Sequence, residues 1–198
     1  MVQPKPQTEQ PAPVAEPPAQ KPSKYERMTP KEKFMAIAKE VTDKYGQFEE
    51  KAPQRGGVRV KKALVVLENG EMYQGEWNDE DEYDGFGARI DEDGDYCEGY
   101  WVNGEQNGPG RWLAENGEFY SGTFKDDLMH GQGTYITKDG DKYVGQFVDG
   151  NQEGQGIKTW PDGRMYEGSW KDDQMNGSGI FWWPDGKKYE GEFKADEF

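Results

Sequence analysis

A short pattern recurs six times in this chain at a nearly constant interval. In each copy an Asn or Asp precedes a Gly, and a Gly-x-aromatic sequence begins five residues after that Gly. Successive turn glycines are 24 residues apart once and 23 residues apart thereafter, and they are Gly70, Gly94, Gly117, Gly140, Gly163 and Gly186. A fixed period of this length indicates one small unit stacked on copies of itself. Such a stack offers a long surface rather than a catalytic cleft.

Each copy has the pattern of a β-hairpin. Asn-Gly or Asp-Gly between two apolar runs favours a type I′ turn, which needs positive φ at both central residues. A run rich in β-branched and aromatic residues precedes the turn, as in residues 134–137, and a Gly-x-Gly precedes that run. After the turn, Tyr-x-Gly-x-Trp/Phe alternates so that both rings share one face, with a glycine between them. We expect rings of successive copies to pack together as the core.

Three departures from the pattern mark the ends and one weak point. Cys97 stands where the other copies have Tyr, and an acidic loop at 79–84 carries one extra residue. The first copy lacks the Gly-x-Gly, so residues 58–67 are expected to form an atypical capping strand. At the other end, charged side chains follow the last strand and would blunt its open edge against aggregation: Lys194, Asp196 and Glu197.

This unit resembles the MORN repeat (membrane occupation and recognition nexus), and the resemblance extends from Leu64 to Phe193. It implies an all-β fold, with six hairpins forming a single-layer, elongated, twisted antiparallel sheet shaped as a trough. It also implies that aromatic side chains line the inner side and form a partner-binding trough. The residues expected there are Tyr73, Trp77, Trp101, Tyr120, Phe124, Tyr143, Phe147, Tyr166, Trp170, Tyr189 and Phe193.

The first third of the chain has a different composition. Residues 1–28 are rich in proline and predict an extended or disordered tail. Residues 29–51 predict an amphipathic helix, because Thr29-Pro30-Lys31-Glu32 forms a capping box and apolar residues follow at helical spacing. This helix would either cap the repeat array of residues 58–198 or dock a partner. Its apolar face consists of Phe34, Ile37, Val41 and Tyr45.

Charge is unevenly distributed between the two parts. Residues 1–63 contain 13 Lys and Arg against 8 Asp and Glu, a net charge of +5, and residues 64–198 contain 11 against 31, a net charge of −20. Such an acidic array disfavours nucleic acid and anionic lipid and favours basic protein partners. A single Cys suits a reducing compartment, and the start of the chain has no apolar signal core, so we expect a cytoplasmic protein.

The sequence offers no set of catalytic or metal-binding residues. His130 is the only histidine, so neither a His cluster nor a Ser-His pair can form within one chain. Cys97 has no histidine near it in sequence, and the acidic runs do not match the spacing of a calcium loop. We therefore expect no enzyme activity, no cofactor and no metal.

The leading hypothesis is a non-enzymatic scaffold subunit of a large cytoskeletal assembly. By family resemblance the assembly would be a ciliary or flagellar axoneme, in a position like that of a radial spoke, with basic or helical segments of other proteins as partners. Two alternatives remain open, a membrane-apposed adaptor that uses the basic helix and a regulatory subunit of an enzyme complex. A homodimer is also compatible with the sequence.

Overall fold

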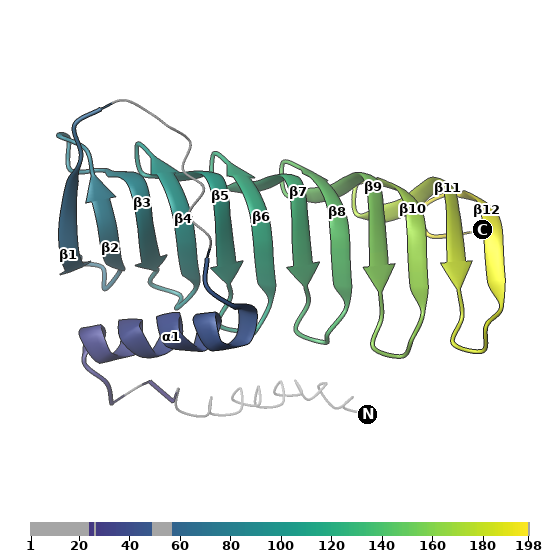
Figure 1. The fold of residues 1–198 in the computed structure, drawn as a ribbon, viewed down its shortest axis with the longest axis horizontal. Coiled ribbons are helices and arrows are strands. Elements are labelled where there is room, and N and C mark those ends of the chain that lie inside the picture. The colour runs from purple at the N-terminus through teal and green to yellow at the C-terminus, as the bar shows by residue number, and fades with distance from the viewer. Residues whose placement is uncertain (1–23, 26, 49–56, 198) are drawn as a thin grey trace, which may run out of the picture.

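The computed structural model describes residues 24–25, 27–48 and 57–197 as one helix followed by twelve strands. All strands belong to one antiparallel sheet, in which each strand pairs with its neighbours in sequence (Figure 1). This confirms the expected all-β sheet of six hairpins preceded by a helix. The elements are α1 (Pro30–Tyr45), β1 (Val60–Val66), β2 (Met72–Trp77), β3 (Tyr83–Ile90), β4 (Tyr96–Val102), β5 (Glu105–Leu113), β6 (Phe119–Lys125), β7 (Leu128–Ile136), β8 (Lys142–Val148), β9 (Asn151–Thr159), β10 (Met165–Lys171), β11 (Gln174–Trp182) and β12 (Lys188–Phe193).

Two sequence predictions fall largely outside this description. The proline-rich tail was expected over residues 1–28, of which only 24, 25, 27 and 28 are described, and residues 49–51 at the end of the expected helix are not described. The helix itself begins with the predicted capping box at Thr29 and Glu32 and ends at Gly46.

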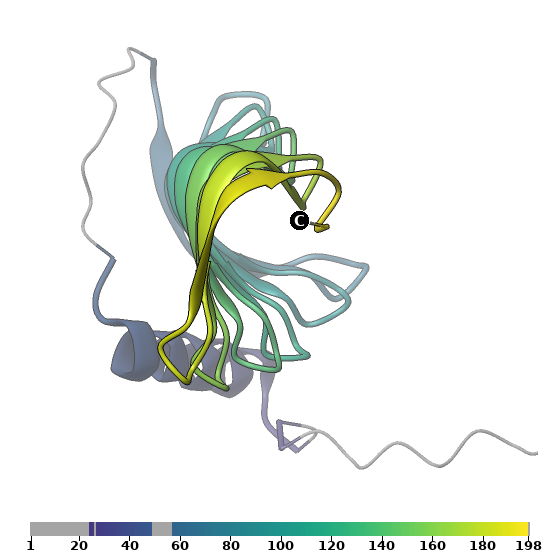
Figure 2. The same ribbon diagram turned by 90° about the vertical axis from the view of Figure 1, so that its right-hand side faces the viewer.

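Each strand bends along its length, so the sheet has a concave and a convex face (Figure 2). A row of glycines crosses it, one on each strand from β2 to β12, and each glycine is directly paired with the next, as in Gly133↔Gly145 and Gly145↔Gly156. In every second pair of strands, the register shifts directly after the paired glycines. Between β10 and β11, for example, the shift lies between Gly168 and Trp170. Bulges of this kind bend a strand and increase its twist, which accounts for the trough.

Each repeat tyrosine lies flat on the glycine row. A Cβ atom built on Gly145 would lie 2.4 Å from the hydroxyl oxygen of Tyr143 and 2.6 Å from the Cα of Gly156. The ring therefore occupies the space that side chains would need. Its hydroxyl donates a hydrogen bond to the carbonyl of Gln146, at 3.0 Å, and Tyr73, Tyr120, Tyr166 and Tyr189 make the same contact three residues on.

The predicted type I′ turn at the repeat glycines is wrong. At the fourth turn only Gly140 has positive φ, and its N–H donates to the carbonyl of Thr137 while the N–H of Thr137 donates to Asp141. This is a three-residue loop closed by a glycine bulge. The two-residue turns with positive φ at both positions lie on the opposite rim, between copies, as at Asp126-Asp127 and Asp172-Asp173.

Helix α1 covers the convex face of the first three hairpins (Figures 1 and 2). Phe34, Ile37 and Val41 are buried there against a cluster that the sheet supplies, and each buried side chain of this size contributes about 1.5–3 kcal/mol. The sheet residues of that cluster are Leu64, Met72, Ala88, Ile90, Tyr96 and Leu113. The same face of β7–β12 has no helix on it among the described residues.

A buried arginine fixes the end of the helix to the sheet. The Nη1 of Arg111 donates to the carbonyl oxygen of Gly46 at 2.7 Å, and its Nε donates to Glu98 Oε2 at 2.7 Å. Next to it, the rings of Tyr45 and Phe119 stack at 3.5 Å between centroids with an angle of 5°. Arg111 is 3% exposed, so its charge is held by these two partners rather than by water.

Replacing a glycine of the row tests the tyrosine contact. We expect Gly145→Ala to lower the free energy of unfolding by about 1–3 kcal/mol, because the added methyl must displace the Tyr143 ring or the Gly156 backbone. Urea denaturation measures this. The control is Gly104→Asn, at a turn where φ is +86° and no atom lies within 4 Å, and its effect should stay within about 0.5 kcal/mol. Equal effects of the two substitutions would contradict the contact.

The packing of α1 is tested at two adjacent helix positions. Phe34→Ala should lower the free energy of unfolding by about 3 kcal/mol, because it leaves a cavity between α1 and the sheet. Met35→Ala, whose side chain is 57% exposed, should change it by less than about 0.5 kcal/mol. If α1 were detached from the sheet in solution, both substitutions would have the smaller effect in urea denaturation.

Candidate partner-binding trough

The aromatic residues predicted from the sequence lie together on the concave face. Ten of the eleven are buried, with exposed fractions of 0–5%, and Tyr189 on the last strand is half-buried. Each tyrosine meets the Trp or Phe of its own strand edge to face, and all except Tyr189 in the last copy also meet that of the next copy. Tyr143, for example, lies 5.2 Å from Phe147 and 5.1 Å from Trp170 between ring centroids. We call this series of contacts the ring ladder, and it forms the core of the array.

Residues that the sequence reasoning did not select also lie on the concave face. On the odd-numbered strands, the residue opposite each tyrosine differs from copy to copy, and these residues are Arg89, Trp112, Tyr135, Lys158 and Phe181. All except Phe181 are half-buried, so they cover the ring ladder and face the trough. In the sequence, these residues could have been recognised because they occupy one fixed position of the repeat at which the residue type varies between copies.

The rim formed by the two-residue turns is acidic, and some of its carboxylates hold the copies together. Asp127 Oδ1 accepts the N–H of Gln106 at 2.6 Å, and Asp173 Oδ1 accepts the N–H of Gln152 at 2.7 Å, in each case from the preceding turn. Asp149 and Asp172 occupy the first position of their turns, with φ of 48°, and both are exposed. Both carboxylates reach solvent, and Asp149 Oδ1 also lies 3.6 Å from the Nδ1 of His130.

The ring ladder is interrupted at Cys97. The buried rings form one cluster with Tyr73 and Trp101 and another that begins at Tyr120, and Trp112 is packed against both. The side chain of Gln106 lies over Gly99 and Gly110, where a tyrosine ring lies in other copies, and it is 2% exposed. Burial raises the pKa of the Cys97 thiol to about 12, so the thiol stays protonated at neutral pH and is a poor nucleophile.

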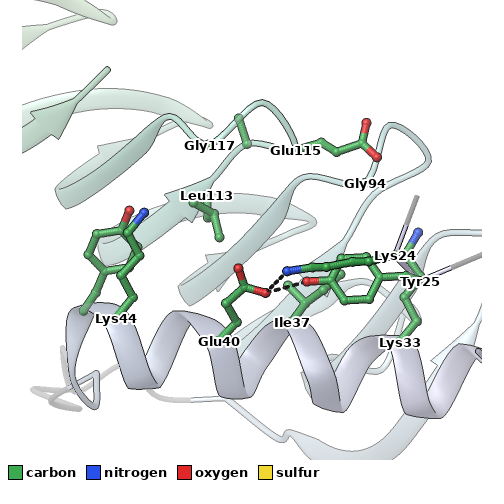
Figure 3. A pocket seen from close by; sticks show the side chains of 12 residues that line it. Lys24, Tyr25, Lys33, Ile37, Glu40, Lys44, Gly94, Leu113, Glu115 and Gly117 are labelled. Atoms are coloured by element: carbon green, nitrogen blue, oxygen red, sulfur yellow. Dashed lines mark hydrogen bonds and ion pairs between the residues drawn. The ribbon is translucent and has the colours of Figure 1, made fainter. Parts of the chain in front are cut away.

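The apolar residues proposed for a docking helix face the sheet. Phe34, Ile37 and Val41 are buried and Tyr45 is partly buried, as the capping alternative expects. A pocket of about 140 Å³ lies where α1 meets the loops at Gly94 and Gly117 (Figure 3). In it Glu40 accepts a hydrogen bond of 2.6 Å from the Tyr25 hydroxyl and pairs with Lys24. A partner of α1 would meet this pocket and the exposed lysines, not the apolar face.

Groups of potential metal ligands and membrane-spanning helices were sought in the part of the chain that the structure describes. Over residues 24–25, 27–48 and 57–197, no three His, Cys, Asp or Glu side chains are grouped so as to hold a metal ion. Within the same ranges, no helix is long and apolar enough to cross a membrane.

The MORN repeat family matches five successive segments of this chain, residues 73–96, 97–119, 120–142, 143–163 and 166–188. Since these segments make up more than half of the chain, the protein belongs to the MORN repeat family, and the resemblance is confirmed. Strand β1 lies outside the matched segments, in keeping with its atypical sequence, and most of β12 lies beyond the last of them. The repeat is a non-catalytic one.

Solved structures give only distant similarity, and no curated protein matches the chain in sequence. The TCP domain of SAS-4 (dCPAP) of Drosophila melanogaster, solved with a proline-rich motif of Ana2 (dSTIL), is 12% identical at a TM-score of 0.41 and covers 74% of this chain and 99% of its own. The G-box domain of the microcephaly protein CPAP is 20% identical at a TM-score of 0.31 and covers 63% and 71%. Similarity at this level carries no argument about function.

The buried tyrosines predict a loss of stability in alkali. Burial, with a smaller effect from Asp196, raises the pKa of Tyr166 from 10 to about 12. The unfolded chain therefore loses this proton first, and the stabilisation present below pH 10 is lost as the pH rises towards 12. We expect the free energy of unfolding, measured in urea, to decline over this range. In Tyr166→Phe the decline should be shallower, with a loss of about 1 kcal/mol at pH 7 because the hydrogen bond to Ser169 is missing. Identical pH profiles would contradict the prediction.

Proposed function

We propose that this protein is a non-enzymatic scaffold whose concave face binds an extended or helical segment of another protein. The observation that carries the proposal is the division of that face into two parts. The ring ladder is buried and gives the trough its shape, whereas the residues that differ between copies, such as Trp112, Tyr135 and Lys158, remain accessible. A surface of this kind can recognise a partner through its variable positions without loss of the fold.

The charge of the array supports a basic partner. Residues 64–198 carry a net charge of −20, and the rim beside the trough bears Asp149 and Asp172 in exposed positions. Lysine and arginine side chains of a partner segment would meet these carboxylates while its apolar side chains contact the trough. Electrostatic complementarity of this type speeds association and selects partners more than it adds affinity.

We further propose that the partner belongs to a cytoskeletal assembly, and specifically to a ciliary axoneme. This part rests on the family resemblance and not on a contact in the fold. Localisation of the tagged protein, followed by identification of what co-purifies after high-salt extraction of the cytoskeleton, tests it. Recovery with membranes or with a catalytic subunit alone would contradict it and favour one of the two alternatives.

The acidic rim is tested by a double substitution, Asp149→Asn with Asp172→Asn. Asn adopts positive φ readily, so these changes remove charge and leave the turns intact. We expect the affinity for the co-purifying partner to fall roughly five- to tenfold at low salt, with a weaker dependence on salt concentration. Titration calorimetry at several salt concentrations measures both quantities.

The matched control removes the same charge from the convex face. Glu167→Gln with Glu190→Gln alters two exposed carboxylates that face away from the trough, on the strands β10 and β12 that flank β11. Affinity and salt dependence should stay as in the unaltered protein. If the control weakened binding as much as the rim variant did, the partner would lie on the convex face or respond only to net charge.

A further inference from the structure

The concave face carries a half-buried aromatic side chain in each of the last four copies (Figure 2). Trp112 and Tyr135 lie opposite a repeat tyrosine, and Trp160 and Trp183 stand two residues nearer the repeat loops. All four pack against the ring ladder. The two rings of each pair are 23 residues apart in sequence, which is one copy, or two strands and about 9.6 Å in space. The trough therefore offers apolar contacts at a regular spacing.

A pocket on the same face lies at the first of these rings, and we call it the Trp112 pocket. It has a volume of about 240 Å³, and its walls include Trp112, Leu128 and Met129, with Asp127 at the rim of two-residue turns. Leu128 is 47% exposed, so this apolar wall is open to solvent. The indole N–H of Trp112 donates to Asp95 Oδ2 at 2.9 Å, which holds the ring in place. The pocket thus joins an apolar wall to an acidic rim.

The spacing of the rings selects the backbone conformation of a segment that lies along the trough. In a polyproline II helix, residues three apart point the same way and are about 9.3 Å apart, close to the length of one copy. Residues three apart in a β-strand point to opposite sides. In an α-helix, residues seven apart are about 10.5 Å apart and turned by about 20°, so register is lost over a few copies. Polyproline II is the regular conformation that stays in register with the array.

We propose that the trough binds a partner segment in the polyproline II conformation with the motif Pro-x-x-Pro. The first proline occupies the Trp112 pocket against Leu128 and Met129, and the second packs on the ring of Tyr135 one copy further along. A lysine or arginine between the two prolines meets the exposed Asp127. The inference rests on the proposed function, since it names the chemistry of the same partner. Such a segment is ordered before it binds, and aromatic-lined grooves are its common binding surfaces.

The test titrates the whole protein with two peptides of twelve residues and equal composition, both acetylated and amidated. One consists of four Pro-Lys-Ala units. The other has the same residues in an order that places no two prolines three or six residues apart. Binding is followed by NMR at the indole N–H groups. We expect saturable shifts at Trp112 and none at Trp182, which lies on the convex face beside Ile180 and Glu190.

The comparison of the two peptides decides between a matched spacing and a general attraction of basic peptides. The Pro-Lys-Ala peptide should bind at least fivefold more tightly than the reordered one, because only its prolines recur once per copy. Equal binding of the two peptides, or equal shifts at Trp112 and Trp182, would overturn the proposal.

Two substitutions of exposed apolar residues on opposite faces locate the binding. Leu128→Ser removes part of the pocket wall and should weaken binding of the Pro-Lys-Ala peptide at least threefold. The matched control is Val144→Ser, on the convex face, and it should leave binding unchanged. The two side chains are 47% and 42% exposed, so both variants should fold. Unchanged binding to Leu128→Ser, or an equal loss in both variants, would show that the peptide does not occupy the pocket.

The failures of the two proposals are distinguishable. If the Pro-Lys-Ala peptide binds at Trp112 but the substitutions of Asp149 and Asp172 leave the partner's affinity unchanged, the proline motif stands and the acidic rim does not. If those substitutions weaken the partner and the two peptides bind equally, the trough stands and the polyproline II segment is wrong.

Discussion

The contact between a tyrosine ring and a pair of glycines is the interaction on which the rest of this structure depends. A side chain on Gly145 or Gly156 would occupy the space of the Tyr143 ring. With the ring flat on the backbone, its edge reaches the Trp or Phe of the next copy and its hydroxyl reaches a carbonyl of its own strand. This one contact packs the core, connects neighbouring copies and gives the buried hydroxyl a hydrogen-bond partner. In this way an array of a single layer still has a packed core.

This arrangement separates the residues that make the fold from those available for recognition. The rings on even-numbered strands are buried and recur in nearly every copy. The residues opposite them on odd-numbered strands change from Arg89 to Trp112 to Tyr135 without disturbing the sheet. The trough can therefore present a different chemical group every two strands along its length. At the interruption Cys97 stays buried, and the buried side chain of Gln106 takes the place of the ring over Gly99 and Gly110.

Helix α1 makes the array asymmetric. It covers the convex face of the first three hairpins, where Arg111, paired with Glu98, binds the carbonyl at its end, and it leaves the concave face open. The lysines of α1 lie outside the trough, so they do not pair with the exposed rim carboxylates Asp149 and Asp172. One face of the sheet is thus partly covered by the protein's own helix, and the other is the face that we propose for a partner.

The sequence by itself determined the six-hairpin array, the common face of the rings and the capping box of α1, because each follows from spacing within a few residues of one strand or helix. The tertiary structure decided the rest. The positive-φ pairs lie between copies and not at the repeat glycines, because hydrogen bonding across the loop selects a bulge at Gly140. Gln106 takes the place over Gly99 and Gly110, and Arg111 reaches Gly46, because strand register and helix packing bring distant positions together. Local patterns contain no record of such contacts, since they depend on which residues face each other after the sheet has curved.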